Sequence, residues 1–332
     1  MNNFEHTHHA HCESGVMSSM LRHYGLNISE PMVFGLTNAL NFAYIPFVKI
    51  GGMPLVAYRS MPKAIIKNIK KNLKVEMKLE TFSSKEKGEQ RLDELLAEGK
   101  IVGAQTSVYW LEYFPKEIRF HFNAHNLLIY AKEGNEYLIS DPVFDKSVRC
   151  SKESLSKARF AKGVMAPKGL LYYPTHIPKE VDLKPIIAKN IKKLSKNMLR
   201  TPVPIAGLKG MKYLAKNIAK LENKDKKYAE LFIAHVVRMQ EEIGTGGAGF
   251  RFMYASFLQE ASELFNNDKT LMDASKMMLA VGDEWREFAL MCAKSLKAKN
   301  KIDFKTLSQK LLHISEEEAK VYKKMLEFKE PI

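Results

Sequence analysis

The sequence predicts an α+β domain over residues 1–175, followed by an all-α helical bundle domain over residues 176–332. Up to residue 175, segments with helical periodicity alternate with strand-like apolar runs. Pro174, Pro178 and Pro185 then mark a linker, and every later segment carries apolar residues at helical spacing. The length of 332 residues is enough for two separate hydrophobic cores.

Turn residues and periodicity place the elements of the first domain in order. Helices are expected at Val16–His23, from Ser29, at Met61–Lys71, from Ser83 or Ser84 to Glu98, and from Ser151 to Ala161. Strands are expected at Val75–Thr81, Ile101–Val108, His125–Tyr130, Tyr137–Ser140 and Gly169–Tyr173, and residues 145–151 can extend the sheet. Gly25 can end the first helix through a left-handed cap, and Ser151 can cap the last.

The second domain is predicted from helical periodicity alone. Its helices are expected at Ile186–Leu199, Ile205–Leu221, Ala229–Ile243, Phe250–Phe265, Leu271–Lys297 and Asp303–Glu327. No repeat of fixed period is visible among them. The pattern therefore indicates a bundle and not a repeat array.

Three residues in the first domain follow the chain order of a papain-like Cys-His-Asp site. Cys12 stands immediately before the first helix, and His125 begins a strand. The turn Glu133-Gly134-Asn135 joins that strand to the next one, which ends at Asp141. Neighbouring antiparallel strands can bring a carboxylate beside an imidazole, so the order predicts covalent catalysis by a cysteine.

Each position suits its predicted role. The positive end of the helix dipole favours the thiolate of Cys12, which is the nucleophilic form. His125 would pair with the thiolate and move protons, and Asp141 would fix its tautomer. Taken alone, a single cysteine is more often a small buried hydrophobe, and Cys150 and Cys292 are expected to be structural in this sense. For Cys12, the joint pattern favours catalysis.

The histidine-rich segment before Cys12 suggests two further roles. His6 lies six residues before the nucleophile, where papain-like enzymes carry a glutamine that donates to the oxyanion. The His6 ring could donate to the oxyanion in this way, or the backbone amide of Cys12 could provide most of the stabilisation. His6, His8, His9 and His11 could also bind zinc with Cys12. No distant second pair of ligands is evident, and we expect no metal.

A glycine-rich loop interrupts two helices of the second domain and offers a candidate donor-binding site. It comprises Gly244, Thr245, Gly246, Gly247 and Gly249, with Arg251 one turn into the next helix. Free amides at a helix start favour an anion, such as the phosphate of a phosphopantetheine arm. The loop matches neither a Walker A motif nor a dinucleotide-binding fingerprint. The alternative is a tight connection between packed helices.

The net charge of +15 predicts an acidic partner or simply a solvated basic surface. Lysines are densest over residues 184–200, and an acidic acyl carrier protein would fit a basic face. Nucleic acid is not expected, because no zinc finger, RNA-recognition signature or helix-turn-helix is visible. No membrane span or signal peptide is expected, and the three cysteines form no disulfide framework, so a cytoplasmic location is predicted.

These motifs resemble a known family. The sequences His-Cys-Glu-Ser-Gly at 11–15, Ala-His-Asn at 124–126 and Asp141-Pro142 are similar to the N-terminal domain of the butirosin biosynthesis protein H family. The segment 244–261 resembles the uncharacterised helical domain that often accompanies it. The resemblance implies a papain-like fold with Cys12, His125 and Asp141 as catalytic residues. It also implies transfer of an aminoacyl group from a carrier-protein thioester to an aminoglycoside amine.

Three functions are therefore considered. The first is an acyltransferase in which Cys12 accepts an acyl group from a carrier-protein or coenzyme A thioester and passes it to an amine or hydroxyl of a small molecule, with no bound cofactor. The second is a cysteine hydrolase, peptidase or amidase, in which water is the acceptor. The third is a basic binding module in which Cys12 is structural. Only the behaviour of an acyl-enzyme would distinguish the first two.

Overall fold

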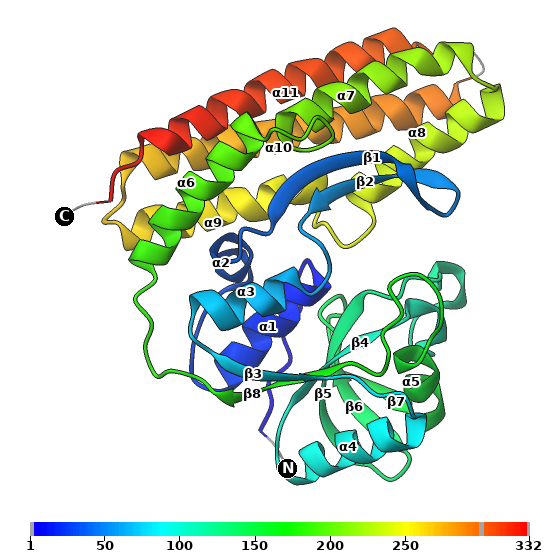
Figure 1. Ribbon diagram of the computed structural model, residues 1–332, viewed down its shortest axis with the longest axis vertical. Helices are drawn as coiled ribbons and strands as arrows, with labels where there is room; N and C mark the ends of the chain where they lie inside the picture. Colours follow the sequence, from blue (N-terminus) through cyan, green and yellow to red (C-terminus); the bar gives the residue numbers. More distant parts are fainter. Residues whose placement is uncertain (1–2, 299–301, 331–332) are drawn as a thin grey trace. The chain divides into compact units, whose positions relative to one another are not determined.

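The computed structural model describes residues 3–298 and 302–330, and it divides the chain into two compact units (Figure 1). Unit 1 consists of Met1–Val33 and Pro62–Val181, and unit 2 consists of Phe34–Met61 and Asp182–Ile332. Unit 1 mixes helices with a sheet, and unit 2 is mainly helical, so the predicted fold classes are confirmed. The division differs from the predicted ranges in two respects: residues 34–61 belong with the helices, and unit 1 extends to Val181 instead of residue 175.

Unit 1 is built on a six-stranded sheet in the order β3-β8-β4-β5-β6-β7, in which every neighbouring pair is antiparallel. The strands are β3 (Glu76–Glu80), β4 (Val102–Thr106), β5 (His125–Glu133), β6 (Glu136–Ser140), β7 (Val148–Ser151) and β8 (Leu171–His176). The helices are α1 (Cys12–His23), α2 (Glu30–Leu36), which runs across the division, α3 (Ala64–Asn72), α4 (Lys85–Ala97) and α5 (Lys152–Arg159). Short 3-10 turns lie at Val108–Trp110 and Lys116–Ile118.

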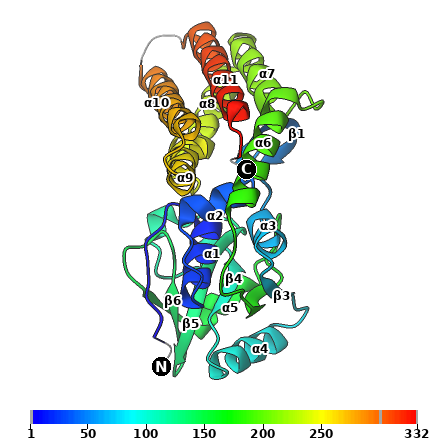
Figure 2. The ribbon, with the colours of Figure 1, turned by 90° about the vertical axis from the view of Figure 1, so that its left-hand side faces the viewer.

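The two faces of this sheet carry different helices. Leu127 and Leu171 point into a core with residues of α4 and α5, such as Leu92 and Leu155. Because side chains alternate along a strand, residues 126, 128 and 172 face the other side. Helix α1 packs against β5 there, on the opposite side of the sheet from α4 (Figure 1, Figure 2). The N-terminus of α1 is thereby placed beside the start of β5.

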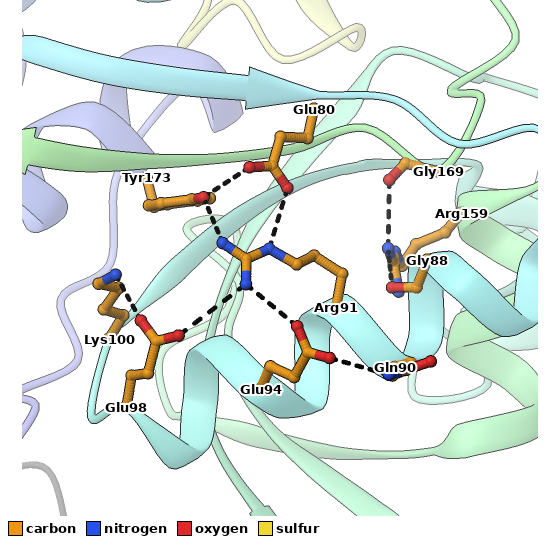
Figure 3. A network of polar contacts seen from close by, with 10 residues as sticks. All are labelled: Glu80, Gly88, Gln90, Arg91, Glu94, Glu98, Lys100, Arg159, Gly169 and Tyr173. Atoms are coloured by element: carbon orange, nitrogen blue, oxygen red, sulfur yellow. Dashed lines mark hydrogen bonds and ion pairs between the residues drawn. The ribbon is translucent and has the colours of Figure 1, made fainter.

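Two arginines fasten α4 to the sheet (Figure 3). Arg91 on α4 donates to Glu80 of β3 at 3.2 Å and to the Tyr173 hydroxyl of β8 at 2.9 Å. Arg159 is fully buried and donates to the carbonyls of Gly88 at 3.0 Å and Gly169 at 3.1 Å. The Arg159 guanidinium therefore ties α4 to the loop that leads into β8.

Predicted caps are observed at two helices. Ser84 accepts a hydrogen bond from the amide of Lys87 at the start of α4, and Ser151 accepts one from Ser154 at the start of α5. Helix α1 begins four residues earlier than expected, at Cys12 instead of Val16. The reason is that His11 caps it, and histidine is not among the residues usually favoured at this position.

Six long helices lie in the described residues of unit 2. These are α6 (Lys184–Arg200), α7 (Gly207–Ala219), α8 (Lys226–Glu241), α9 (Arg251–Leu264), α10 (Lys269–Lys297) and α11 (Phe304–Glu327), with short 3-10 turns at Lys220–Asn223 and Ala248–Phe250. All six predicted helices are found, with their ends displaced by a few residues.

A two-stranded hairpin belongs to unit 2, and the sequence analysis did not predict it. Strand β1 (Leu40–Ile50) pairs with β2 (Met53–Arg59) around Gly51 and Gly52, which have φ angles of 59° and 83°. A Gly-Gly pair between two apolar runs is a known hairpin signal. The hairpin packs on α7 and α8, and this non-local packing explains why residues 34–61 join the helical unit.

Candidate active site

The turn that carries Cys12 is fixed by a buried carboxylate. Glu30 accepts hydrogen bonds from the amides of Ala10 at 2.8 Å and His11 at 2.9 Å, and from the hydroxyl of Ser14 at 2.9 Å. The His11 ring in turn accepts the amide of Ser14 and caps α1. Cys12 is the first residue of this helix, so its sulfur lies at the positive end of the helix dipole.

His125 and Asp141 meet as the sequence predicts. The β5–β6 pairing places Leu128 opposite Ser140, so Asp141 returns to the start of β5. His125 Nε2 lies 2.7 Å from Asp141 Oδ2, and the Tyr113 hydroxyl donates to the same oxygen at 2.7 Å. A carboxylate with two such donors is held firmly in one orientation.

Cys12 lies beside this pair, since the side chain of Asn126, the residue after His125, reaches to 4.0 Å from the Cys12 sulfur. Because Nε2 is engaged by Asp141, Nδ1 is the ring nitrogen left for an interaction with the sulfur. Burial opposes a charged ring, but Asp141 and the Cys12 sulfur outweigh it and raise the pKa of His125 to about 10. An imidazolium held between a thiolate and a carboxylate is the charge arrangement that activates a cysteine nucleophile.

Aromatic rings restrict the access of water to the His125–Asp141 pair. The rings of Phe114 and His125 pack edge to face, with 5.6 Å between their centroids. The ring of Phe144 packs on Phe114 in the same way, with 4.8 Å between the centroids. Cys12 is 6% exposed, His125 5% and Asp141 0%. In such a site, electrostatic interactions are stronger than in water.

Both ring nitrogens of His6 have partners other than an oxyanion, in contrast to the role expected from the sequence. Its Nδ1 lies 2.7 Å from the Ser140 hydroxyl, and its Nε2 lies 2.9 Å from the carbonyl of Phe144. A carbonyl only accepts, so Nε2 carries the proton and Nδ1 accepts from Ser140. Both ring nitrogens are therefore used to hold the segment around Asp141.

His9 also has structural partners. His9 Nε2 lies 3.0 Å from the Ser19 hydroxyl, and the His9 amide donates to the carbonyl of Pro142 at 2.7 Å. The second bond joins the segment before Cys12 directly to the Asp141-Pro142 segment. Within residues 3–298 and 302–330, no group of three or more His, Cys, Asp or Glu is arranged to hold a metal ion.

Sequence reasoning missed two residues that lie beside Cys12. The Asn126 side-chain amide lies 4.0 Å from the Cys12 sulfur, and the Tyr172 hydroxyl donates to the Asn126 side-chain oxygen at 3.1 Å. The available signal was the position of Asn126 directly after His125, within the segment already singled out. Tyr172 carries no local signal, since only strand pairing brings it there.

The glycine-rich loop of unit 2 does not form the predicted phosphate seat. The Arg251 guanidinium is fully buried, bonded to Glu318 at 2.8 Å and to the carbonyl of Gly249 at 2.7 Å. The amides of Gly247 and Ala248 donate to acceptors within the unit. A Cβ at Gly249 would lie 2.3 Å from the Tyr58 ring. The glycines serve close packing, which was the alternative explanation.

The remaining cysteines do not resemble nucleophiles. Cys150 and Cys292 are fully buried, and burial raises the pKa of each thiol to about 12. They form no disulfide. In the part of the chain that the structure describes, no helix has the length and apolar character needed to span a bilayer.

Comparisons with known proteins agree with the arrangement of the chain. Residues 11–142 match the family model described as butirosin biosynthesis protein H, N-terminal, and residues 153–325 match that of a domain of unknown function (DUF4872). No curated protein matches the chain. Among solved structures, a C39-like peptidase from Bacillus anthracis is similar, with a TM-score of 0.37 and 15% identity over 54% of this chain and 98% of that chain. The chain therefore belongs to the DUF4872 family, whose domain follows a segment that is similar to the N-terminal part of butirosin biosynthesis protein H.

Proposed function

We propose that this protein is an acyltransferase that uses Cys12 to move an acyl or aminoacyl group from a thioester donor to an amine or hydroxyl acceptor. The observation that carries the proposal is the buried His125–Asp141 pair beside Cys12, which lies at the N-terminus of α1. The match to butirosin biosynthesis protein H supports an acyl-thioester donor, either coenzyme A or the phosphopantetheine arm of a carrier protein. No bound cofactor is required.

The reaction follows from the geometry in two steps. The Cys12 thiolate attacks the thioester carbonyl, and the donor thiol leaves with a proton from the His125 imidazolium. The acceptor amine or hydroxyl then attacks the acyl-enzyme, and neutral His125 takes its proton. The Cys12 thiolate and the imidazolium are restored when the product leaves. Exchange of one thioester for another is nearly balanced in energy, so a cysteine suits the first step.

Burial of the site supports transfer over hydrolysis. A thioester on Cys12 would form among residues that are at most 6% exposed, beside the rings of Phe114 and Phe144. Restricted access of water protects an acyl-enzyme until an acceptor binds. The hydrolase alternative uses the same three residues and differs in the fate of this intermediate.

The test is the mass of the intact protein after incubation with a short acyl thioester. We expect one added acyl group, mapped to the Cys12 peptide and removed faster when an amine is added than in buffer alone. Cys150→Ala and Cys292→Ala are matched controls that should acylate normally, because both thiols are buried. Decay at the same rate with and without amines of varied structure would indicate a hydrolase, and no acyl-enzyme would exclude the proposed chemistry.

A basic surface on unit 2 suits an acidic donor protein. Helices α6 and α7 pack side by side, and residues 183–221 contain no acidic residue. Ten exposed cations lie along this stretch: Lys184, Lys189, Lys192, Lys193, Lys196, Arg200, Lys209, Lys212, Lys216 and Lys220. A surface of one sign raises the association rate of an oppositely charged partner. We therefore propose this face, the α6–α7 basic face, as the docking surface for an acidic acyl carrier protein.

Charge reversal tests this surface. With a carrier-protein donor at low salt, the double variant Lys192→Glu/Lys196→Glu should raise KM by about fivefold or more, since two attractive charges become repulsive. Use of a small acyl thioester should not change. Lys276→Glu/Lys323→Glu, exposed on α10 and α11, is the matched control. The docking face would be contradicted if both double variants raised KM for the carrier protein equally. It would also be contradicted if added salt changed KM equally for the carrier protein and the small thioester.

A further inference from the structure

The side chain of Asn126 is held in one orientation by two neighbours. Its Nδ2 donates to the carbonyl of Ala124 at 3.1 Å, and its Oδ1 accepts the hydroxyl of Tyr172 at 3.1 Å. Because a carbonyl cannot donate, the nitrogen of the amide must face Ala124, which fixes the assignment of Oδ1 and Nδ2. Asn126 is 3% exposed and Tyr172 is fully buried, so water does not compete for these bonds.

The second hydrogen on this nitrogen is directed at the nucleophile. Asn126 Nδ2 lies 4.0 Å from Cys12 Sγ, with the geometry of a hydrogen bond to sulfur. The alternation of β5 explains the placement, because residues 126 and 128 share the face that carries α1. A fixed N–H dipole aimed at an anion in a water-poor site stabilises that anion more than it would in water.

Tyr172 is suited to hold the amide. Its hydroxyl must remain protonated in order to donate to Asn126 Oδ1. Burial, with the nearby Glu13 carboxylate and Cys12 sulfur, raises the pKa of Tyr172 well above its usual range. The ring packs over Gly103, where a Cβ would lie only 2.1 Å from it, so the position of the ring is fixed by its strand neighbour.

We propose that Asn126 is a further catalytic residue, which holds the Cys12 sulfur as a thiolate, and that Tyr172 is its positioning residue. The sulfur is then stabilised by the amide of Asn126 in addition to the charged ring of His125. The role differs from that predicted for His6, whose nitrogens are engaged elsewhere. The inference rests on the proposed function only in taking Cys12 as the nucleophile.

The experiment is the rate of Cys12 alkylation by iodoacetamide as a function of pH, followed by peptide mapping. Replacing Asn126 with leucine keeps the branching at Cγ and removes the amide. The pH midpoint of alkylation should rise by about one unit, which is roughly a tenfold loss of thiolate below the midpoint. Tyr172→Phe should move the midpoint in the same direction by less. In the double variant, Tyr172→Phe should add nothing to Asn126→Leu, because it acts only through Asn126.

Tyr173→Phe is the matched control. Tyr173 is the next residue on β8 and points to the other face, where its hydroxyl bonds to Glu80 and Arg91. Its removal should leave the pH midpoint unchanged. If Asn126→Leu does not fold, Tyr172→Phe carries the test alone, since its ring is retained.

Three results would overturn the proposal: an unchanged midpoint in folded Asn126→Leu, an unchanged midpoint in Tyr172→Phe, or a Tyr172→Phe shift that persists in the double variant. Alkylation needs no thioester donor, so failure here is distinct from failure of the acyltransferase proposal. The Asn126→Leu shift could be observed in a protein that never forms an acyl-enzyme. Equally, a protein that forms an acyl-enzyme could show no shift.

Discussion

Replacing His125 with alanine is expected to slow acylation of Cys12 by about four orders of magnitude, comparable to the loss of a member of a catalytic triad. The imidazolium both stabilises the thiolate and protonates the departing thiol, and neither neighbour can replace it. Cys12→Ala should abolish acyl-enzyme formation outright. Because the two residues act as one unit, the double variant should be no worse than Cys12→Ala alone. The measurement is single-turnover acylation with a short thioester.

Asp141→Asn separates orientation from proton transfer in the same assay. Asp141→Asn should lower the acylation rate less than His125→Ala does, since the imidazole remains present. In the wild type, rates should fall above about pH 10, where His125 loses its proton. Removing the carboxylate should move this alkaline limit to lower pH, because Asp141 is what raises the pKa of His125. Activity of Cys12→Ala with a verified donor, or an unmoved alkaline limit in Asp141→Asn, would contradict the assignment.

Loss of the buried ion pair in unit 2 should produce the largest change in stability. Arg251→Ala is expected to lower the free energy of unfolding by about 3–5 kcal/mol, because it leaves Glu318 buried without its cation. Glu318 is 0% exposed, and Trp285 and Tyr322 donate to it at 2.7 and 2.8 Å. The double variant Arg251→Met/Glu318→Leu should be less affected than Arg251→Ala, since it removes both charges at once.

Tryptophan fluorescence can report this unit alone. The sequence contains two tryptophans, Trp110 in unit 1 and Trp285 beside the ion pair, so a Trp110→Phe background isolates the second. Urea unfolding in that background gives the comparison. Arg286→Ala is a matched control, because that side chain is 60% exposed and its loss should change stability by less than about 0.5 kcal/mol. A small effect of Arg251→Ala would show that the pair contributes little to stability.

Local sequence signals predicted the candidate catalytic residues and most elements because each signal spans only a few residues. Cys12 stands shortly before an expected helix, His125 starts a strand and Asp141 follows the next strand. The hairpin between Glu133 and Glu136 then brings His125 and Asp141 together. The helices of unit 2 were equally predictable, since each has a continuous apolar stripe.

The misses depend on contacts between distant residues. His6 was assigned by its distance from Cys12, but its ring turns to Ser140 and Phe144, more than 130 positions away. Arg251 was read with the neighbouring glycines, but its partner Glu318 lies 67 residues later. A local pattern shows that a cation follows a loop, and it contains no information about which carboxylate neutralises that cation.

The hairpin β1–β2 also has a consequence for biosynthesis. It lies early in the chain, yet it packs on α7 and α8, which are made more than 140 residues later. Four apolar side chains of the hairpin are at most 3% exposed in the folded protein: Phe42, Tyr44, Val56 and Tyr58. During synthesis they emerge from the ribosome before the helices on which they pack. The sheet of unit 1, in contrast, has all its strands once residue 181 has emerged. A nascent chain of this protein therefore passes through a stage in which unit 1 can be complete while the apolar hairpin, which is inserted in its sequence, is still exposed.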